Sequence, residues 1–101
     1  MIKVSVIIPC LDIKKSINGC LNSINNQKFI FLKARIEVIC IIDGHSEDLK
    51  FLEKWEKDNK NNLNFELKIC FLKKNRGAGY SRYTGFKICT GEFIAFLDDD
   101  D

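Results

Sequence analysis

Four short apolar runs alternate along this chain with segments of helical periodicity, and this alternation constrains the fold more than any other feature. The runs are rich in β-branched residues, as the strands of buried sheets are, and they cover residues 3–8, 35–42, 65–72 and 92–97. Between them, apolar side chains recur at the spacing of one helix face, from Ile13 to Ile24 and again from Leu49 to Trp55. We therefore expect an α/β fold, a Rossmann-like parallel sheet of about four strands with helices on both faces.

Local signals set the expected ends of these elements. Pro9 stops the first strand, because proline has no N–H to donate to a neighbouring strand. Ser46 is expected to cap the second helix, and the third helix should begin near Gly77 or Ala78 and end at residues 90–91. The third apolar run alternates with polar residues, which favours a place near an edge of the sheet. The fourth run is expected to be a buried strand.

Composition and charge exclude several classes of protein. A chain of 101 residues has room for one domain, and 46% hydrophobic with 30% charged residues is typical of a soluble globular protein. Sixteen basic and 14 acidic residues give a net charge of +2, which is too balanced to indicate binding to nucleic acid. No apolar stretch approaches the roughly 20 residues that span a bilayer, and the first residues lack the layout of a signal peptide. We expect a cytoplasmic protein, with peripheral attachment to the inner face of the membrane left open.

The cysteines do not indicate a disulfide framework or a zinc site. Their number is odd, no two form a C-x-x-C pair, and they stand at positions 10, 20, 40, 70 and 89. Such cysteines are interpreted as small hydrophobic residues in a reducing compartment.

Four consecutive aspartates, Asp98 to Asp101, follow the fourth apolar run. Like charges this close repel one another, so a positive partner is expected. A divalent cation suits this role, since Mg²⁺ is typically held by one or two carboxylates together with phosphate oxygens of a substrate. The alternative is an acidic, solvated segment with no ligand.

Aspartates also follow other strands of the predicted sheet. In parallel α/β sheets, ligands bind outside the carboxyl ends of the strands, where strand order reverses. The segments that follow the four strands are residues 9–12, 43–48, 75–79 and 98–101, and three of them contain aspartate. We expect these carboxylates to converge on one edge of the sheet. Asp43 would lie at the mouth of this crevice, where it could accept a hydrogen bond from a nucleobase or a ribose; otherwise it caps a helix or its own turn.

The remaining candidates near these strand ends are weaker. Residues 75–79 look like a phosphate-binding loop but match neither standard glycine pattern. Arg82 could reach a phosphate or an aspartate, or form a surface salt bridge. Gly44 allows a positive φ or the close approach of a ligand. His45 is interpreted as a loop residue, and Gly85 as a position of close packing.

Six fragments of the chain, in this order, resemble the family 2 glycosyltransferases of the inverting A-type fold. They are Val4–Pro9 with Asp12, Asn26–Gln27, Glu37–Asp48, Asn75–Gly77, Ser81–Arg82 with Gly85, and Thr90–Asp101. The resemblance covers essentially the whole chain. It implies that the sheet is the N-terminal half of an A-type fold and that the ligand is a nucleotide-sugar donor, most often a UDP-sugar.

The resemblance implies a role for residues after the first two strands. Pro9, Leu11 and Asp12 would line the nucleoside pocket, and Asp43 would contact the base. Two departures bear on the choice of donor more than on the fold: Leu11 stands where an aromatic residue is usual, and Tyr83 where an asparagine is common. Asp12 also stands where an asparagine is usual.

The resemblance also implies a metal motif in the acidic segment. Asp98 and Asp99 would lie near the ribose and the diphosphate, and Asp98 with Asp100 would form the D-x-D motif that binds Mn²⁺ or Mg²⁺. Such a cation stabilises the charge that develops on the leaving nucleotide. Arg82 would add to this stabilisation or hold an aspartate in place.

In this family, the acceptor-binding half and the general base lie beyond the metal motif. Residues 1–101 are therefore expected to be a donor-binding half-domain without the acceptor-binding half, with little or no turnover by itself. The acceptor in the full-length protein would be a saccharide or a lipid-linked molecule, and the isolated half-domain could self-associate. One alternative is a non-catalytic nucleotide-binding or interaction module from a truncated or decayed gene. A phosphoryl-transfer receiver is disfavoured, because it needs an acidic residue where this chain has Pro9 and Cys10.

Overall fold

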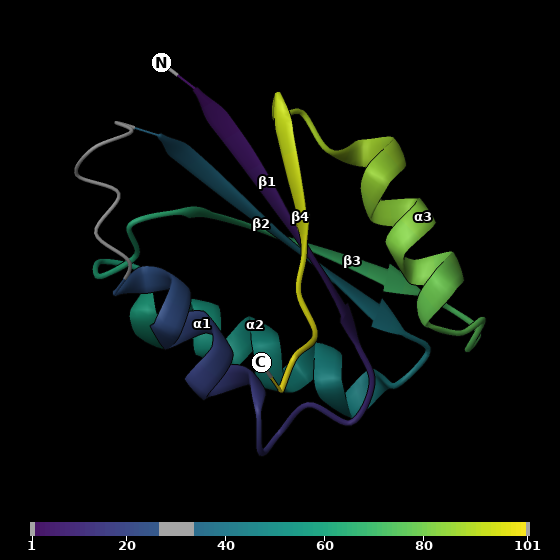
Figure 1. Cartoon of the computed structure of the whole chain (residues 1–101). Coiled ribbons are helices and arrows are strands. Elements are labelled where there is room, and N and C mark those ends of the chain that lie inside the picture. Colours follow the sequence, from purple (N-terminus) through teal and green to yellow (C-terminus); the bar gives the residue numbers. More distant parts are fainter. Residues whose placement is uncertain (1, 27–33, 101) are drawn as a thin grey trace.

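The structure, a computed structural model, describes residues 2–26 and 34–100 and forms one parallel sheet with three helices (Figure 1). The elements follow one another as β1 (Lys3–Cys10), α1 (Ile17–Asn25), β2 (Arg35–Asp43), α2 (Ser46–Asn59), β3 (Glu66–Leu72), α3 (Ala78–Ile88) and β4 (Phe93–Phe96). The strand order is β3-β2-β1-β4, and each neighbouring pair is parallel. The predicted α/β fold is confirmed. Gln27 and Asp101, which belong to two of the family fragments, lie outside the described residues.

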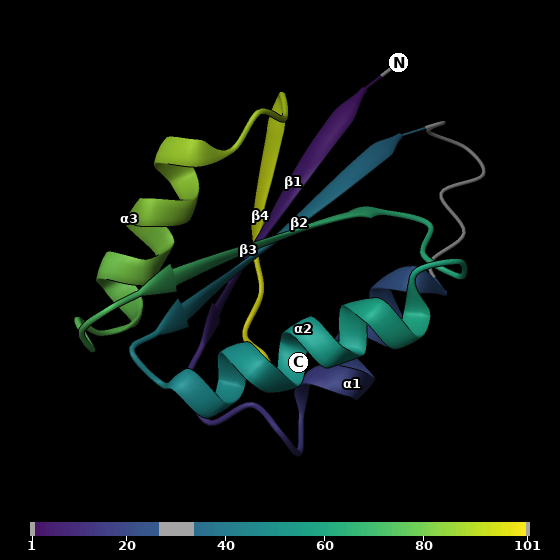
Figure 2. The same cartoon turned by 180° about the vertical axis from the view of Figure 1, so that it is seen from behind.

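Helices cover both faces of the sheet, as predicted. Helices α1 and α2 lie on one face and α3 on the other, which is clearest when Figures 1 and 2 are compared. Side chains that point to alternate faces of β1 divide between these layers: Ile8 belongs to the core with α1 and α2, whereas Ile7 faces Gly85 of α3. A Cβ atom at Gly85 would collide with the Ile7 side chain, so the predicted close packing at this glycine is confirmed.

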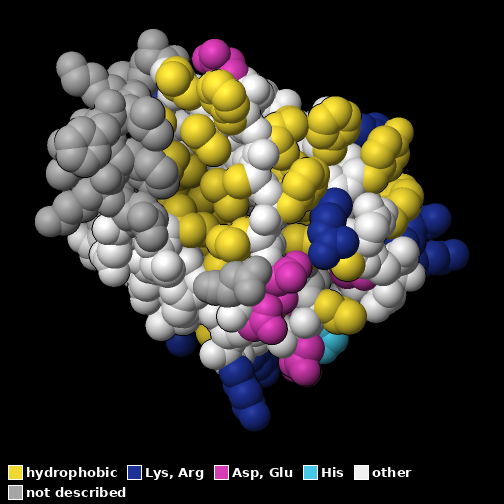
Figure 3. Space-filling view, in the orientation of Figure 1, with side chains coloured by type: hydrophobic (Ala, Val, Ile, Leu, Met, Phe, Trp, Pro, Cys, Tyr) yellow, Lys and Arg dark blue, Asp and Glu magenta, His cyan; other side chains and the backbone are white. Residues whose placement is uncertain are grey.

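The two edge strands differ from the centre of the sheet. Eight of the nine residues of β2 are buried, because β1 and β3 flank it and helices cover both its faces. β3 lies at one edge, as predicted. The prediction of a buried fourth strand is wrong: all four residues of β4 are exposed, with Phe93 at 58% and Phe96 at 51%. Figure 3 shows apolar side chains gathered on this face, over β4 and α3. The strand pairs with β1, but no described helix lies over it to bury its aromatic side chains.

The helix ends mostly follow the sequence signals. Helix α3 begins at Ala78, as predicted, and ends at Ile88, just before the expected stop. Ser46 does not cap α2: the helix already includes it, and His45 occupies the N-cap position without a side-chain hydrogen bond.

No helix in the described ranges has the length and apolarity to cross a bilayer. All five cysteines are thiols and not disulfides; three are buried and two, Cys70 and Cys89, are partly exposed.

A buried carboxylate, Glu37, joins three strands near their amino ends. It is fully buried, and its Oε1 lies 2.6 Å from the Lys68 ammonium. Its Oε2 accepts hydrogen bonds from the Ser5 hydroxyl and from the Thr90 N–H, the latter at 2.6 Å. Burial by itself would raise the pKa of Glu37, but the hydrogen bonds from Lys68, Ser5 and Thr90 outweigh it and lower the pKa to about 2. This network fixes the turn that leads into β4.

Candidate functional site

A cavity of about 300 Å³ opens at the carboxyl ends of the strands, where the sequence predicts the site. It is lined by Pro9, Cys10, Leu11, Asp43, Asn75, Gly77, Ala78, Ser81, Asp98, Asp99 and Asp100. The carboxyl ends of β1 and β2 and the segments that follow β3 and β4 contribute to these walls. Strand β1 continues through Pro9 to Cys10, so the prediction that Pro9 stops it is wrong. The predicted convergence of aspartates is confirmed for Asp43 and residues 98–100, which share one cavity although they are distant in sequence, but not for Asp12.

Asp43 fixes the loop that leads into α3. Its side chain is 3% exposed, its Oδ1 accepts a hydrogen bond of 2.7 Å from the Arg76 N–H, and its Oδ2 accepts one of 2.9 Å from the Gly77 N–H. Asp43 thus caps neither α2 nor its own turn. One lone pair on each oxygen remains for a ligand. The contact of Asp43 with a nucleobase stays a prediction. What the structure shows is that Asp43 fixes the position of residues 75–77, which form part of the cavity wall.

Gly44 allows this loop to pack closely against the end of β2. Its φ is +81°, and a Cβ atom at this position would lie 2.6 Å from the Asn75 nitrogen. The positive φ expected from the sequence is confirmed. The group that lies close to Gly44 is the backbone of Lys74 and Asn75, not a ligand.

The acidic segment is held against the rest of the molecule by three side chains. The Ser16 hydroxyl donates a hydrogen bond of 2.6 Å to Asp99 Oδ2, and the Cys20 thiol lies 3.8 Å from the Asp98 carbonyl oxygen. Arg82 Nη2 lies 3.3 Å from Asp98 Oδ1, so Arg82 does hold an aspartate, although it does not line the cavity. This pair is about half exposed, and its net contribution to stability is small. Asp100 forms no hydrogen bond or ion pair with the described residues.

Hydrogen bonds to Asp48, in α2, hold the loop that follows β1. No role for Asp48 was predicted from the sequence. Asp48 is fully buried and accepts hydrogen bonds from the N–H groups of Asp12, at 2.6 Å, and Ile13, at 3.0 Å. His45 Nδ1 lies 3.1 Å from the same carboxylate. The sequence does contain a pattern that predicts the burial of Asp48: it precedes Leu52 by four residues and therefore shares the buried face of α2.

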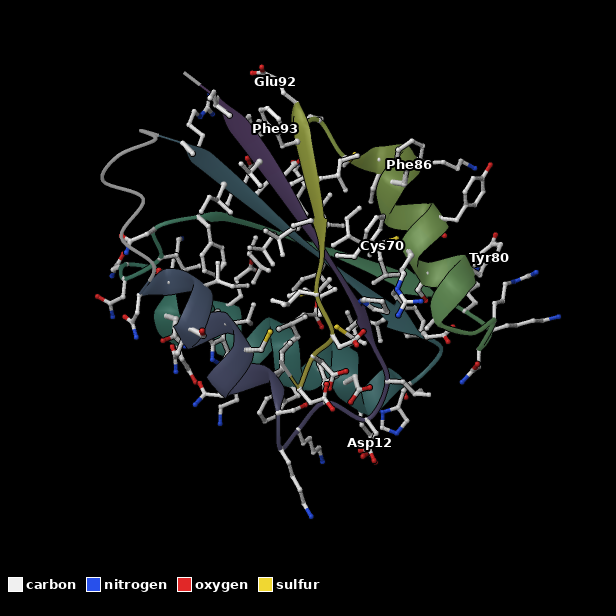
Figure 4. The ribbon with its side chains drawn as sticks, viewed as in Figure 1. Asp12, Cys70, Tyr80, Phe86, Glu92 and Phe93 are labelled. Carbon is white, nitrogen blue, oxygen red and sulfur yellow. The ribbon has the colours of Figure 1, made fainter. Side chains whose placement is uncertain are left out.

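Asp12 itself does not line the cavity. It is exposed, its φ is +57°, and Figure 4 shows its side chain pointing outward from the loop. Its backbone turns the chain from β1 toward α1. Pro9 and Leu11, the other two residues predicted for the nucleoside pocket, both line the cavity. Leu11 is 50% exposed and offers an apolar surface at the rim.

The carboxylates of the cavity suit a cation that is coordinated only partly by the protein and otherwise by water or by a bound phosphate. Among the described residues, no group of three or more His, Cys, Asp or Glu side chains is gathered to enclose a metal ion. Asp98 and Asp100 nevertheless line the same cavity. A pair of carboxylates suits Mg²⁺ or a similar cation, which keeps several waters or binds phosphate oxygens of a substrate.

A second cavity, of about 450 Å³, lies beside Lys3, Arg35 and Glu66 at the opposite end of the sheet. Lys3 and Glu66 already belong to ion pairs there, at 3.7 Å from Glu37 and 3.9 Å from Lys68 respectively. The amino ends of parallel strands are also not where such sheets bind ligands. The aspartate-lined cavity is therefore the candidate site.

Comparisons with solved structures agree with the observed fold. The chain superimposes on a crystal structure of residues 1–349 of TarS from Staphylococcus aureus in complex with UDP, with a TM-score of 0.73 and 34% identity. That match covers 97% of this chain and 27% of the other. A mannosyltransferase from Pyrobaculum calidifontis, in complex with GDP-Man and Mn²⁺, gives a TM-score of 0.76 at 21% identity, over 96% of this chain and 27% of the other. The sheet and its helices are thus those of an A-type glycosyltransferase fold.

Sequence comparisons identify the family. The chain is 37% identical over 103 residues to the poly(ribitol-phosphate) beta-N-acetylglucosaminyltransferase TarS of S. aureus, a match that covers all of this chain and 17% of TarS. It is 32% identical to a poly(ribitol-phosphate) beta-glucosyltransferase of Bacillus spizizenii, over 98% of this chain and 15% of the relative. The chain therefore spans less than a fifth of the length of these two proteins. The family model of glycosyl transferase family 2 matches residues 5–101, and the chain belongs to this family.

Proposed function

We propose that this chain is the donor-binding part of a glycosyltransferase that transfers a sugar from a UDP-sugar to an acceptor hydroxyl with inversion. One observation carries the proposal: Asp43 and the acidic segment 98–100 line a single cavity at the carboxyl ends of parallel strands. The complex of the related TarS with UDP supports a uridine nucleotide as the ligand.

The nucleoside would occupy the side of the cavity formed by the ends of β1 and β2. Pro9 and Leu11 offer apolar surface for the base, and Asp43 has a free lone pair on each oxygen for a base N–H or a ribose hydroxyl. Asp12 contributes to the same pocket through its backbone, because its N–H bond to Asp48 holds the loop that carries Leu11.

The diphosphate would lie at the acidic segment together with Mn²⁺ or Mg²⁺, held by Asp98 and Asp100. The bound cation supplies Lewis-acid stabilisation of the charge that develops on the leaving nucleotide. Arg82 keeps Asp98 oriented and adds a permanent positive charge beside it. Ser16 fixes Asp99, which would face the ribose and diphosphate.

The acceptor and the general base belong to the longer protein in this proposal. The matched curated relatives act on poly(ribitol-phosphate), by their names, and this chain spans only a small part of their length. A saccharide or lipid-linked acceptor, a cytoplasmic location and self-association of the isolated chain remain predictions. If the chain is instead a non-catalytic module, it would bind nucleotide without supporting transfer by any longer form.

Thermal unfolding in the presence of ligand tests the proposal. UDP with Mn²⁺ should raise the melting temperature by several degrees, because a ligand that binds only the folded state stabilises it. Mn²⁺ alone, and UDP with a chelator, are the controls. No shift at millimolar UDP and Mn²⁺ would overturn the proposal.

Replacement of Asp100 tests the metal assignment. Asp100→Ala should abolish the Mn²⁺-dependent part of the shift and leave the ligand-free protein as stable as before or slightly more so, since one member of a repelling cluster is removed. Asp58→Ala, at an exposed position of α2, is the matched control. A large loss of stability in ligand-free Asp100→Ala would mean that the aspartate serves the fold instead.

A further inference from the structure

Ser81 carries a buried hydroxyl that has no partner in the described part of the protein. It lies in the first turn of α3, is 0% exposed and lines the candidate cavity. Apart from contacts with charged side chains, three buried side-chain atoms form no hydrogen bond to described residues: Ser81 Oγ, Glu37 Oε1 and His45 Nδ1. The other two lie close to a charged side chain, since Glu37 Oε1 is 2.6 Å from Lys68 and His45 Nδ1 is 3.1 Å from Asp48. Only Ser81 Oγ, of these three atoms, is left without either kind of contact.

The local backbone does not satisfy this hydroxyl. Serine and threonine in helices commonly donate to the carbonyl oxygen four residues earlier, and Thr84 does so, at 2.9 Å from the Tyr80 oxygen. The corresponding acceptor for Ser81 is the Gly77 oxygen, which receives the Ser81 N–H at 3.1 Å but not the hydroxyl. A buried hydroxyl without a partner is costly, and a ligand that supplies one removes that cost on binding.

The position of Ser81 favours the nucleoside end of the cavity. Ser81 is bonded through its N–H to Gly77, and the N–H of Gly77 is in turn held by Asp43. It therefore adjoins the wall that Asp43 shapes. The acidic segment lines the same cavity, and its own charges would require a cation before a phosphate could approach it.

We propose that the Ser81 hydroxyl hydrogen-bonds the nucleoside part of the bound nucleotide and contributes to its selection. This inference rests on the proposed function and names a further binding residue in that site. A carboxylate such as Asp43 only accepts hydrogen bonds, whereas a hydroxyl both donates and accepts. Ser81 can therefore pair with a base carbonyl or a ribose hydroxyl in a way that Asp43 cannot.

The test compares Ser81→Ala with the wild-type chain, using two probes, UDP and pyrophosphate, each with Mn²⁺. Calorimetric titration should show UDP binding weakened about 3- to 10-fold in the variant, which is the usual effect of one lost hydrogen bond. Pyrophosphate binding should be unchanged. The melting temperature of the ligand-free variant should stay equal or rise, because an unsatisfied buried hydroxyl has been removed. Ser23→Ala, an exposed position in α1, is the control.

Three results would overturn the inference. They are equal UDP affinity in Ser81→Ala and wild type, an equal loss for UDP and pyrophosphate, and a fall of several degrees in the melting temperature of the ligand-free variant. The last result would assign the hydroxyl to the fold. If the wild-type chain does not bind UDP at all, the proposed function is wrong and this inference falls with it. If the wild-type chain binds UDP but Ser81→Ala gives one of the three results above, only this inference is wrong.

Discussion

Asp43, at the end of β2, holds Gly77, at the start of α3, through a hydrogen bond of 2.9 Å from the Gly77 N–H to its Oδ2. The adjacent Arg76 N–H donates to the other oxygen of the same carboxylate. One side chain thus joins the end of a central strand to the start of α3, and both line the cavity. The shape of the cavity depends on this carboxylate before any ligand binds.

Asp43→Ala should therefore reduce both stability and nucleotide binding. The substitution leaves two backbone N–H groups without their acceptor, which should lower the free energy of unfolding by about 1–3 kcal/mol. UDP affinity in the presence of Mn²⁺ should fall as well, because the loop of residues 75–77 loses its anchor. Urea unfolding and calorimetric titration measure the two effects, with Asp58→Ala as the control. An unchanged urea midpoint would show that these two hydrogen bonds do not stabilise the fold.

Glu37 should make stability depend on pH in the acidic range. Burial opposes its ionisation, but hydrogen bonds from Lys68, Ser5 and Thr90 prevail and lower the pKa of Glu37 from 4.5 to about 2. A carboxyl with a lowered pKa stabilises the folded state above the pKa of the unfolded chain, and this contribution is lost as pH falls through the lower value. We expect this contribution to be on the order of 3 kcal/mol at neutral pH.

The comparison of Glu37→Gln with wild type by urea unfolding checks this expectation. The variant should be less stable at pH 6, and the difference should shrink between pH 4.5 and pH 2 as wild-type Glu37 takes up a proton. A difference that stays constant across this range would show that the ionised carboxylate is not the stabilising species.

Gly85 provides a test of packing between α3 and the sheet. Gly85→Ala would place a methyl group against the Ile7 side chain and should cost about 1–3 kcal/mol, the usual penalty of overpacking. Gly79→Ala is a matched control in the same helix, because no atom lies within 4 Å of its added Cβ. The control should be neutral or more stable by up to about 1 kcal/mol, since alanine favours helix. Equal urea midpoints for the two variants would contradict the packing at Ile7.

The sequence predicts the sheet and the place of the site well because both depend on local patterns. The alternation of strands and helices indicates a parallel sheet, and a residue that directly follows a strand must lie at its carboxyl end. This is why Asp43 and the aspartates 98–100 meet in one cavity. The same reasoning locates Leu11 at the rim.

Other features depend on contacts between residues that are distant in sequence, and local sequence patterns do not predict such contacts. Glu37 and Asp48 are charged residues in buried places, and their partners come from other strands and loops. The apolar run of β4 has the pattern of a buried strand, yet burial requires a covering layer that lies outside that run. Asp12 has a positive φ and its side chain lies outside the cavity, and the neighbouring residues in the sequence do not predict either feature.

The exposed position of β4 has a practical consequence for solution work on this chain. Among the described residues, this strand pairs with β1 alone, so the backbone groups of its outer side are available to another strand. Two copies could meet there, and any coupling between their association and nucleotide uptake would distort an apparent dissociation constant. Titrations should accordingly be repeated over a wide span of protein concentrations and extrapolated to dilute conditions.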